Sequence, residues 1–183
     1  STGGVSSLTI EERCAPVCAE WVEANSLNVG SVNLGDAVYK NPIDEVRYCV
    51  DQIIKNRKIP EIEVFEIGMI RTVKELSLQY EFVKPILFSI VLGHIGAAPA
   101  TVGTLKLMID ALYENFPNRE DVLWGITHAH REDFEIVKAA LDMGASTVRI
   151  GFEDSNYLNP TTQVDCNLPL VREVADIIKS KNM

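Results

Sequence analysis

One short stretch brings a cation and two carboxylates together. A predicted strand over residues 147–151 carries Arg149 in its middle, and Glu153 and Asp154 follow directly in a polar loop. A guanidinium in a buried strand is costly unless an anion neutralises it. Two acids supply more negative charge than one arginine needs, and the surplus indicates a metal site or a proton-transfer site. A purely structural ion pair is the alternative, because structural networks also gather charges.

The elements that would position these side chains alternate along the chain. Strand and helix patterns in turn predict an α/β fold with a parallel sheet and right-handed connections. The nearly unbroken apolar run over residues 85–92 suits a strand covered on both faces. Periodicity alone does not separate an open sheet from a barrel. Strands are predicted over 24–30, 60–66, 85–92, 122–127 and 147–151, and helices over 9–21, 41–54, 66–80, 101–113, 132–143 and 168–180.

Polar side chains cluster where the predicted strands end. Ligand sites of parallel α/β folds lie at the carboxyl ends of the strands. These residues are therefore expected to share one pocket mouth. They are Asn28, His94, His128, His130, Glu153 and Asp154.

The predicted strand over 60–66 carries acids on one face. Glu61 and Glu63 alternate along it and share that face with Phe65. Unpaired charge is costly to bury, so acids along an interior strand indicate a functional pocket. The alternative is an edge strand with a solvated acidic face.

The composition fits one α/β domain over residues 1–183. The chain is 46% hydrophobic and has a formal net charge of −9, which disfavours nucleic acid and anionic membranes as partners. Cys14 and Cys18 lie four apart and are predicted to pack on one helix face, which suits a reducing compartment. No apolar run reaches the length of a membrane span, and no signal-peptide pattern opens the chain. We expect a cytoplasmic protein.

Several stretches together resemble the β-keto acid cleavage enzymes, a family with a member in lysine fermentation. The resemblance implies a (β/α)8 TIM barrel, zinc or another divalent metal, and a homo-oligomer, commonly a tetramer. It also implies a reaction in which a β-keto acid and acetyl-CoA give acetoacetate and a new acyl-CoA. The matching stretches are residues 1–4 (STGG), 26–33 (SLNVGSVN), 60–69 (PEIEVFEIGM), 91–93 (VLG), 149–154 (RIGFED) and 156–158 (NYL).

The resemblance assigns roles to individual residues. Glu153 matches the carboxylate ligand of the metal. Arg149 and Asp154, with Ser1, match the group that handles deprotonation of the substrate. Adjacent residues in extended chain point to opposite sides, so Glu153 and Asp154 can serve different roles. The substrate pocket is expected to include Glu63, Ser26 and Gly4 by the resemblance, and Asn28 as a polar residue at a strand end.

The chain also departs from the family pattern. The family's metal-binding His-x-His pair lies on its second strand, and this sequence begins at the later Ser-Thr-Gly-Gly turn. We therefore expect a partial barrel that starts at the end of the third strand. Such a chain is a piece of a longer polypeptide or takes its partner strands from another chain. Alone, it is expected to be dimeric, domain-swapped or marginally stable, because unpaired edges would be exposed.

Other departures leave the substrate open. His128 and His130 form a second His-x-His motif, which could bind the metal, line the pocket mouth or be exposed. Arg131 is placed near a phosphate of CoA. The loop after Gly93 lacks the family's paired glycines, and Ser155 replaces a common asparagine. Two alternative functions follow: a non-catalytic remnant that acts as a binding or assembly module, and an aldolase-like lyase that needs no CoA.

Overall fold

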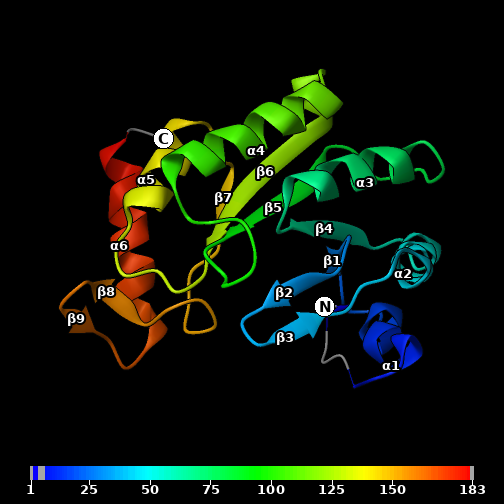
Figure 1. Ribbon diagram of the computed structural model, residues 1–183, viewed down its shortest axis with the longest axis horizontal. Helices are drawn as coiled ribbons and strands as arrows, with labels where there is room; N and C mark the ends of the chain where they lie inside the picture. The colour runs from blue at the N-terminus through cyan, green and yellow to red at the C-terminus, as the bar shows by residue number, and fades with distance from the viewer. Residues whose placement is uncertain (1, 4–6, 182–183) are drawn as a thin grey trace.

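The strands of the main sheet follow one another in sequence order. A computed structural model describes residues 2–3 and 7–181, and these residues form a five-stranded sheet in the order β1-β4-β5-β6-β7. Every neighbouring pair is parallel, and Figure 1 shows helices α2 to α5 arranged in an arc around the sheet. This is the expected α/β fold of the TIM-barrel type, with five consecutive strands. The strands are β1 (Ala24–Asn28), β4 (Ile59–Val64), β5 (Ile86–Leu92), β6 (Val122–His128) and β7 (Thr147–Val148).

The predicted helices are present, with one exception. The helix expected over residues 9–21 ends after five residues and continues as a 3-10 turn, because Pro16 cannot continue the α-helical bonding. Thr9 and Glu12 form the expected capping box. Cys14 is buried and Cys18 is exposed, so these two do not share a packed face as predicted. The helices are α1 (Ile10–Cys14), η1 (Ala15–Cys18), α2 (Ile43–Lys55), α3 (Ile67–Ser77), α4 (Val102–Asn115), η2 (Arg119–Asp121), α5 (Glu135–Asp142) and α6 (Asn167–Ser180).

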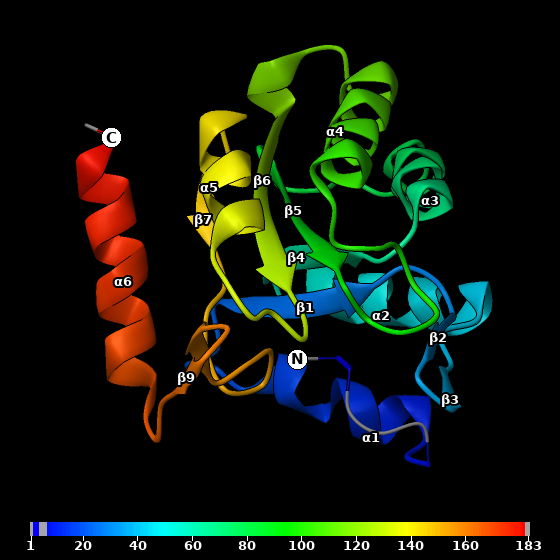
Figure 2. The same ribbon diagram turned by 60° about the vertical axis from the view of Figure 1, so that its left-hand side comes forward.

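Buried apolar side chains of the described residues gather in two clusters. The larger joins the sheet to α2, α3 and α4, and includes Phe88 and Trp124 from neighbouring strands. The smaller joins α5 to α6 and includes Phe134 and Leu170. Figure 2 shows α6 at the side of the molecule, next to α5. Burying a large apolar side chain contributes roughly 1.5–3 kcal/mol, so each cluster holds its own elements in place.

Two short hairpins were not predicted. β2 (Val32–Leu34) pairs with β3 (Ala37–Tyr39), and β8 (Tyr157–Asn159) pairs with β9 (Thr162–Gln163). The predicted strand over 147–151 is wrong beyond Val148, so Arg149 follows the strand and does not lie inside it. None of the described helices has the length and apolar character needed to cross a membrane.

Candidate active site

Parallel register places the acids of β4 beside polar residues of β1. Ser26 lies opposite Glu61, and Asn28 lies opposite Glu63. Opposed residues of neighbouring strands point to the same face of the sheet. β4 pairs with β1 on one side and β5 on the other, so the edge-strand interpretation of its acidic face is wrong. The acids line a cavity instead.

This cavity has a volume of about 460 Å³ and lies at the carboxyl ends of the strands. It brings together most of the residues predicted for the site. Ser1 and Gly4 lie outside the described residues. The predicted residues that line the cavity are Ser26, Asn28, Glu63, Arg149 and Glu153, joined by the backbone of Gly3.

Arg149 and Asp154 form a two-point ion pair. Arg149 Nε lies 3.0 Å from Asp154 Oδ2, and Nη2 lies 2.5 Å from Oδ1. The side chain of Asp154 is 4% exposed and that of Arg149 is 36% exposed. Burial by itself would lower the pKa of Arg149, but the bond to Asp154 and the nearby acids outweigh it and raise that pKa. Arg149 therefore stays a cation at the cavity wall.

Glu63 approaches the same guanidinium from β4. Its Oε1 lies 3.6 Å from Arg149 Nη1, and its Oε2 accepts a 2.5 Å hydrogen bond from Asn28 Nδ2. Burial raises the pKa of Glu63, and the charge of Arg149 and the bond from Asn28 only partly offset this. Glu63 is thus held between a cation and an amide donor.

Glu153 differs from its neighbour in exposure. Its side chain is 81% exposed, and its Oε1 lies 3.8 Å from Arg149 Nη2. Asp154 is turned inward, where its backbone oxygen also accepts from His130 N at 2.8 Å. The two adjacent acids point differently, as expected. Of these two acids, Glu153 lines the cavity and has no close hydrogen bond to its carboxylate among the described residues.

The described residues do not assemble a complete metal centre. No group of three His, Cys, Asp or Glu side chains among them converges on one point, whereas a catalytic zinc usually has three protein ligands. Glu153 is available as one donor. His130 lines a neighbouring cavity of about 280 Å³ together with Asp154. His128 is half-buried, and its Nδ1 has no partner among the described residues.

Arg131 is not where the sequence placed it. Its side chain is 1% exposed, and its guanidinium stacks on the Phe134 ring at 4.1 Å. Burial lowers its pKa. A side chain enclosed in this way does not reach a phosphate at the surface, so the expected contact with CoA is wrong for this geometry.

Sequence reasoning missed the residue that anchors the N-terminal turn. Arg13 Nε donates to Gly3 O at 2.7 Å, and Thr2 Oγ1 donates to Ser26 O at 2.7 Å. Arg13 also lies 3.2 Å from the Glu45 carboxylate. These bonds hold residues 2–3 against β1 at the cavity. One signal was present: Arg13 lies in a short helix with no acid three or four positions away.

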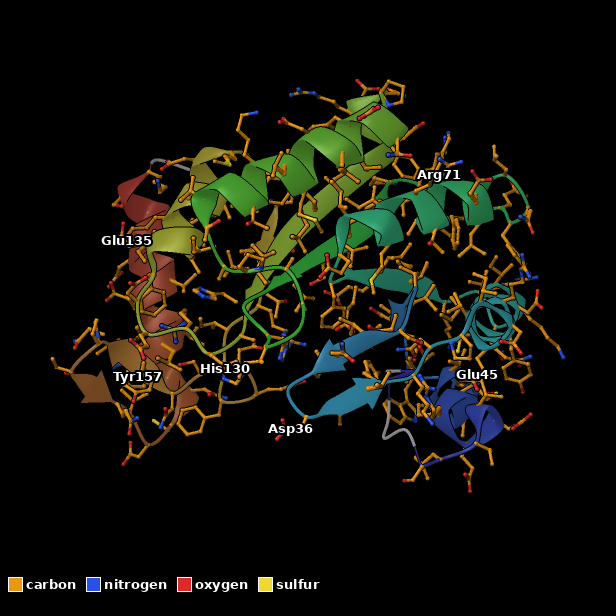
Figure 3. All side chains as sticks on the ribbon, viewed as in Figure 1. Asp36, Glu45, Arg71, His130, Glu135 and Tyr157 are labelled. Carbon is orange, nitrogen blue, oxygen red and sulfur yellow. The ribbon has the colours of Figure 1, made fainter. Side chains whose placement is uncertain are left out.

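His94 is a second residue whose place in the site had no assigned role. It follows β5 and lines the main cavity. Its ring contacts those of Phe65 and His130, with centroids 5.8 Å and 5.7 Å away. His130, the ring partner of His94, is labelled in Figure 3 and lies in that view between Asp36 of the β2–β3 hairpin and Tyr157 of β8. Its position after a strand was the only sequence signal.

Comparisons with known proteins give relatives along the whole chain. The chain is 31% identical over 180 residues to a 3-keto-5-aminohexanoate cleavage enzyme of Acetoanaerobium sticklandii, covering 98% of this chain and 63% of that protein. A protein of the same name from Fusobacterium nucleatum is 30% identical, with 98% and 62% covered. A 3,5-dioxohexanoate:acetyl-CoA acetone transferase of Paraburkholderia graminis is 25% identical, with 100% and 66% covered. The chain thus spans somewhat less than two thirds of the first two relatives.

A solved structure agrees on the fold. The structure of ObcA in its apo form superposes with a TM-score of 0.70 at 17% identity, covering 87% of this chain and 41% of that one. A binary complex of ObcA with oxaloacetate gives a TM-score of 0.71. The sequence profile of the beta-keto acid cleavage enzyme family matches residues 1–183. The chain therefore belongs to the beta-keto acid cleavage enzyme family.

Proposed function

We propose that the protein is a metal-dependent β-keto acid cleavage enzyme. It converts a β-keto acid and acetyl-CoA into acetoacetate and a new acyl-CoA. In this reaction, the carbon–carbon bond between the acyl group and the carboxymethylene unit of the keto acid breaks, and the carboxymethylene unit forms a new bond to the acetyl group. CoA leaves the acetyl group and forms a thioester with the released acyl group. No electron is gained or lost. The observation that supports this function is the bidentate Arg149–Asp154 pair at a cavity shared with Glu63 and Glu153.

The exchange requires a carbanion at the methylene, so a proton must leave it. We assign this step to Arg149 and Asp154, together with Ser1. Arg149 is held on one edge by Asp154, which fixes the direction of its remaining donors. A guanidinium so fixed binds a carboxylate or a developing enolate with little reorganisation. Glu63, Ser26, Asn28 and Gly4 are assigned to the substrate pocket.

Glu153 is proposed as one ligand of zinc or another divalent ion. When bound, such an ion polarises a keto oxygen. The described residues supply no second and third ligand, and the proposal for this chain is limited to the one carboxylate. The proposed enzyme is a cytoplasmic homo-oligomer, and acetyl-CoA is its co-substrate.

The test measures acetoacetate formed from acetyl-CoA and a panel of β-keto acids, together with the zinc content of the purified protein. Arg149→Ala should abolish turnover and retain zinc, because it removes the fixed donor and no ligand. Glu153→Gln should lose zinc. Unchanged zinc occupancy in the Gln variant would remove Glu153 from the ligands.

The same assay separates the alternatives. Cleavage of the keto acid without acetyl-CoA would favour a CoA-independent lyase. A wild-type protein that binds zinc and turns over no member of the panel would favour a binding or assembly module.

A further inference from the structure

The main cavity is acidic, although the proposed substrate is an anion. Glu61, Glu63 and Glu153 line it, and Arg149 is the cationic side chain among the described lining residues. Part of that cation is already neutralised by Asp154. Carboxylates would repel the oxygens of a β-keto acid unless other donors face them. The substrate therefore needs hydrogen-bond donors beyond Arg149.

Most donors on the described cavity wall already have partners. Asn28 Nδ2 donates to Glu63 Oε2 at 2.5 Å. Arg149 Nη1 faces Glu63 at 3.6 Å. Tyr39 also lines the cavity, with its ring centre 5.9 Å from the Arg13 guanidinium. Asn28 and Arg149 therefore have less capacity left for a ligand.

His94 differs from these donors. Ser26 also has a partner of its own, whereas no hydrogen bond joins the His94 imidazole to the described residues. Its printed contacts are ring contacts, with Phe65 at 5.8 Å and His130 at 5.7 Å between centroids. The imidazole is thus positioned by packing, with its nitrogen atoms free for a ligand in the cavity.

The loop that carries His94 is fixed on both sides. Gly93 has φ +95°, and a Cβ there would lie 2.4 Å from Ala129 O, so only glycine fits this approach to the β6 loop. On the other side, Gly35 N of the β2–β3 hairpin donates to Ile95 O at 2.8 Å. A donor on a fixed loop binds a ligand with a smaller loss of conformational entropy.

Burial and neighbouring charges favour the neutral form of the His94 imidazole. Burial lowers its pKa below the usual 6.5, and the nearby His130 and Arg149 act in the same direction, while Asp154 and Glu153 oppose them. A neutral imidazole offers one N–H donor and one nitrogen acceptor. At neutral pH it can donate to an anionic oxygen without pairing with the acids around it as a cation would.

We propose that His94 is a further substrate-binding residue, whose imidazole N–H donates to an oxygen of the β-keto acid beside Arg149. This inference rests on the proposed function and adds a hydrogen-bond donor to the side of the site where Arg149 lies.

Steady-state kinetics test the contact directly. His94→Phe keeps a ring against Phe65 and removes the donor, so KM for the keto acid should rise about tenfold, with kcat and KM for acetyl-CoA unchanged. His94→Gln restores a donor and should recover part of that loss. Ile95→Ala is the matched control, because Ile95 lies in the same loop and is 71% exposed. An unchanged KM in His94→Phe would overturn the inference.

Binding of acetoacetate gives a readout that does not need turnover. The chain has three histidines, and ¹⁵N-labelled imidazole signals can be assigned by substituting each in turn. Acetoacetate should shift the His94 signal and bind about tenfold more weakly to His94→Phe. Equal binding by wild type and His94→Phe, or no binding by wild type, overturns the inference. Binding through His94 without acyl exchange would support the inference and overturn the proposed function.

Discussion

Arg13 and Arg131 are 5% and 1% exposed, yet their guanidinium groups meet different surroundings. Arg13 donates to the backbone oxygens of Gly3 and Lys40 and to the side chains of Asn41 and Glu45. Arg131 donates weakly to a backbone oxygen at 3.4 Å, and its Nε and Nη2 have no acceptor among the described residues.

The two buried guanidinium groups are stabilised in different ways. Around Arg13, carbonyl oxygens and one carboxylate replace the lost water, and the cation in turn ties the N-terminal turn to α2. Around Arg131, the face of Phe134 and the more distant charges of Asp133 and Asp154 supply the attraction. Arg13 therefore connects two segments beside the site, residues 2–3 and α2. The contacts of Arg131, by contrast, could be replaced by those of an apolar side chain.

Removing the charge of Arg13 should have the largest effect on stability. Arg13→Met should lower the free energy of unfolding by about 1–3 kcal/mol, because it leaves the Gly3 carbonyl oxygen and the Asn41 side-chain oxygen without their buried donor. Urea unfolding monitored by circular dichroism measures this. Arg47→Met, at an exposed position of α2, is the control and should change stability by less than about 0.5 kcal/mol. A loss for Arg13→Met no larger than the control's would contradict the anchoring role.

The same change at Arg131 should cost much less. Arg131→Met keeps an apolar stem against Phe134 and removes unsatisfied donors, so the expected loss in the free energy of unfolding is below about 1 kcal/mol. The same urea series measures it. A loss as large as that of Arg13→Met would show that Arg131 has a strong partner, and the contrast between the two arginines would fail.

Glu63 offers the smallest and most specific test, through pH. Because its folded pKa is raised above 4.5, the folded state binds this proton more tightly than the unfolded state does. The ionised form therefore costs stability, and the cost grows as pH rises from 4.5 through the raised pKa. Relative to Glu63→Gln, wild type should lose stability over that interval. If the stability of wild type relative to Glu63→Gln stays constant or increases with pH, the prediction is wrong. In that case Arg149 and Asn28 would lower the Glu63 pKa by more than burial raises it.

The sequence predicted which polar side chains lie together better than it predicted the segments that hold them. Arg149 and Asp154 meet as expected because they lie five residues apart, and Glu63 faces them because period-2 alternation is strict within a strand. The strands β2 and β3 have three residues each, too few for a periodic signal. The role of Arg13 depends on contacts with residues 28 and 32 positions away. Such contacts arise from the tertiary fold and leave no local pattern.

The smaller hydrophobic cluster has a consequence for the order in which the molecule opens. The helix α6 packs on α5 through Leu170 and its neighbours, apart from the larger core, so it can detach as a separate cooperative unit. Its first residue, Asn167, accepts a hydrogen bond from Phe152 N at 3.1 Å. Detachment would release the segment that carries Glu153 while Arg13 still holds residues 2–3. The two sides of the cavity would then open at different rates. Amide hydrogen exchange should be faster at residue 152 than at residue 2.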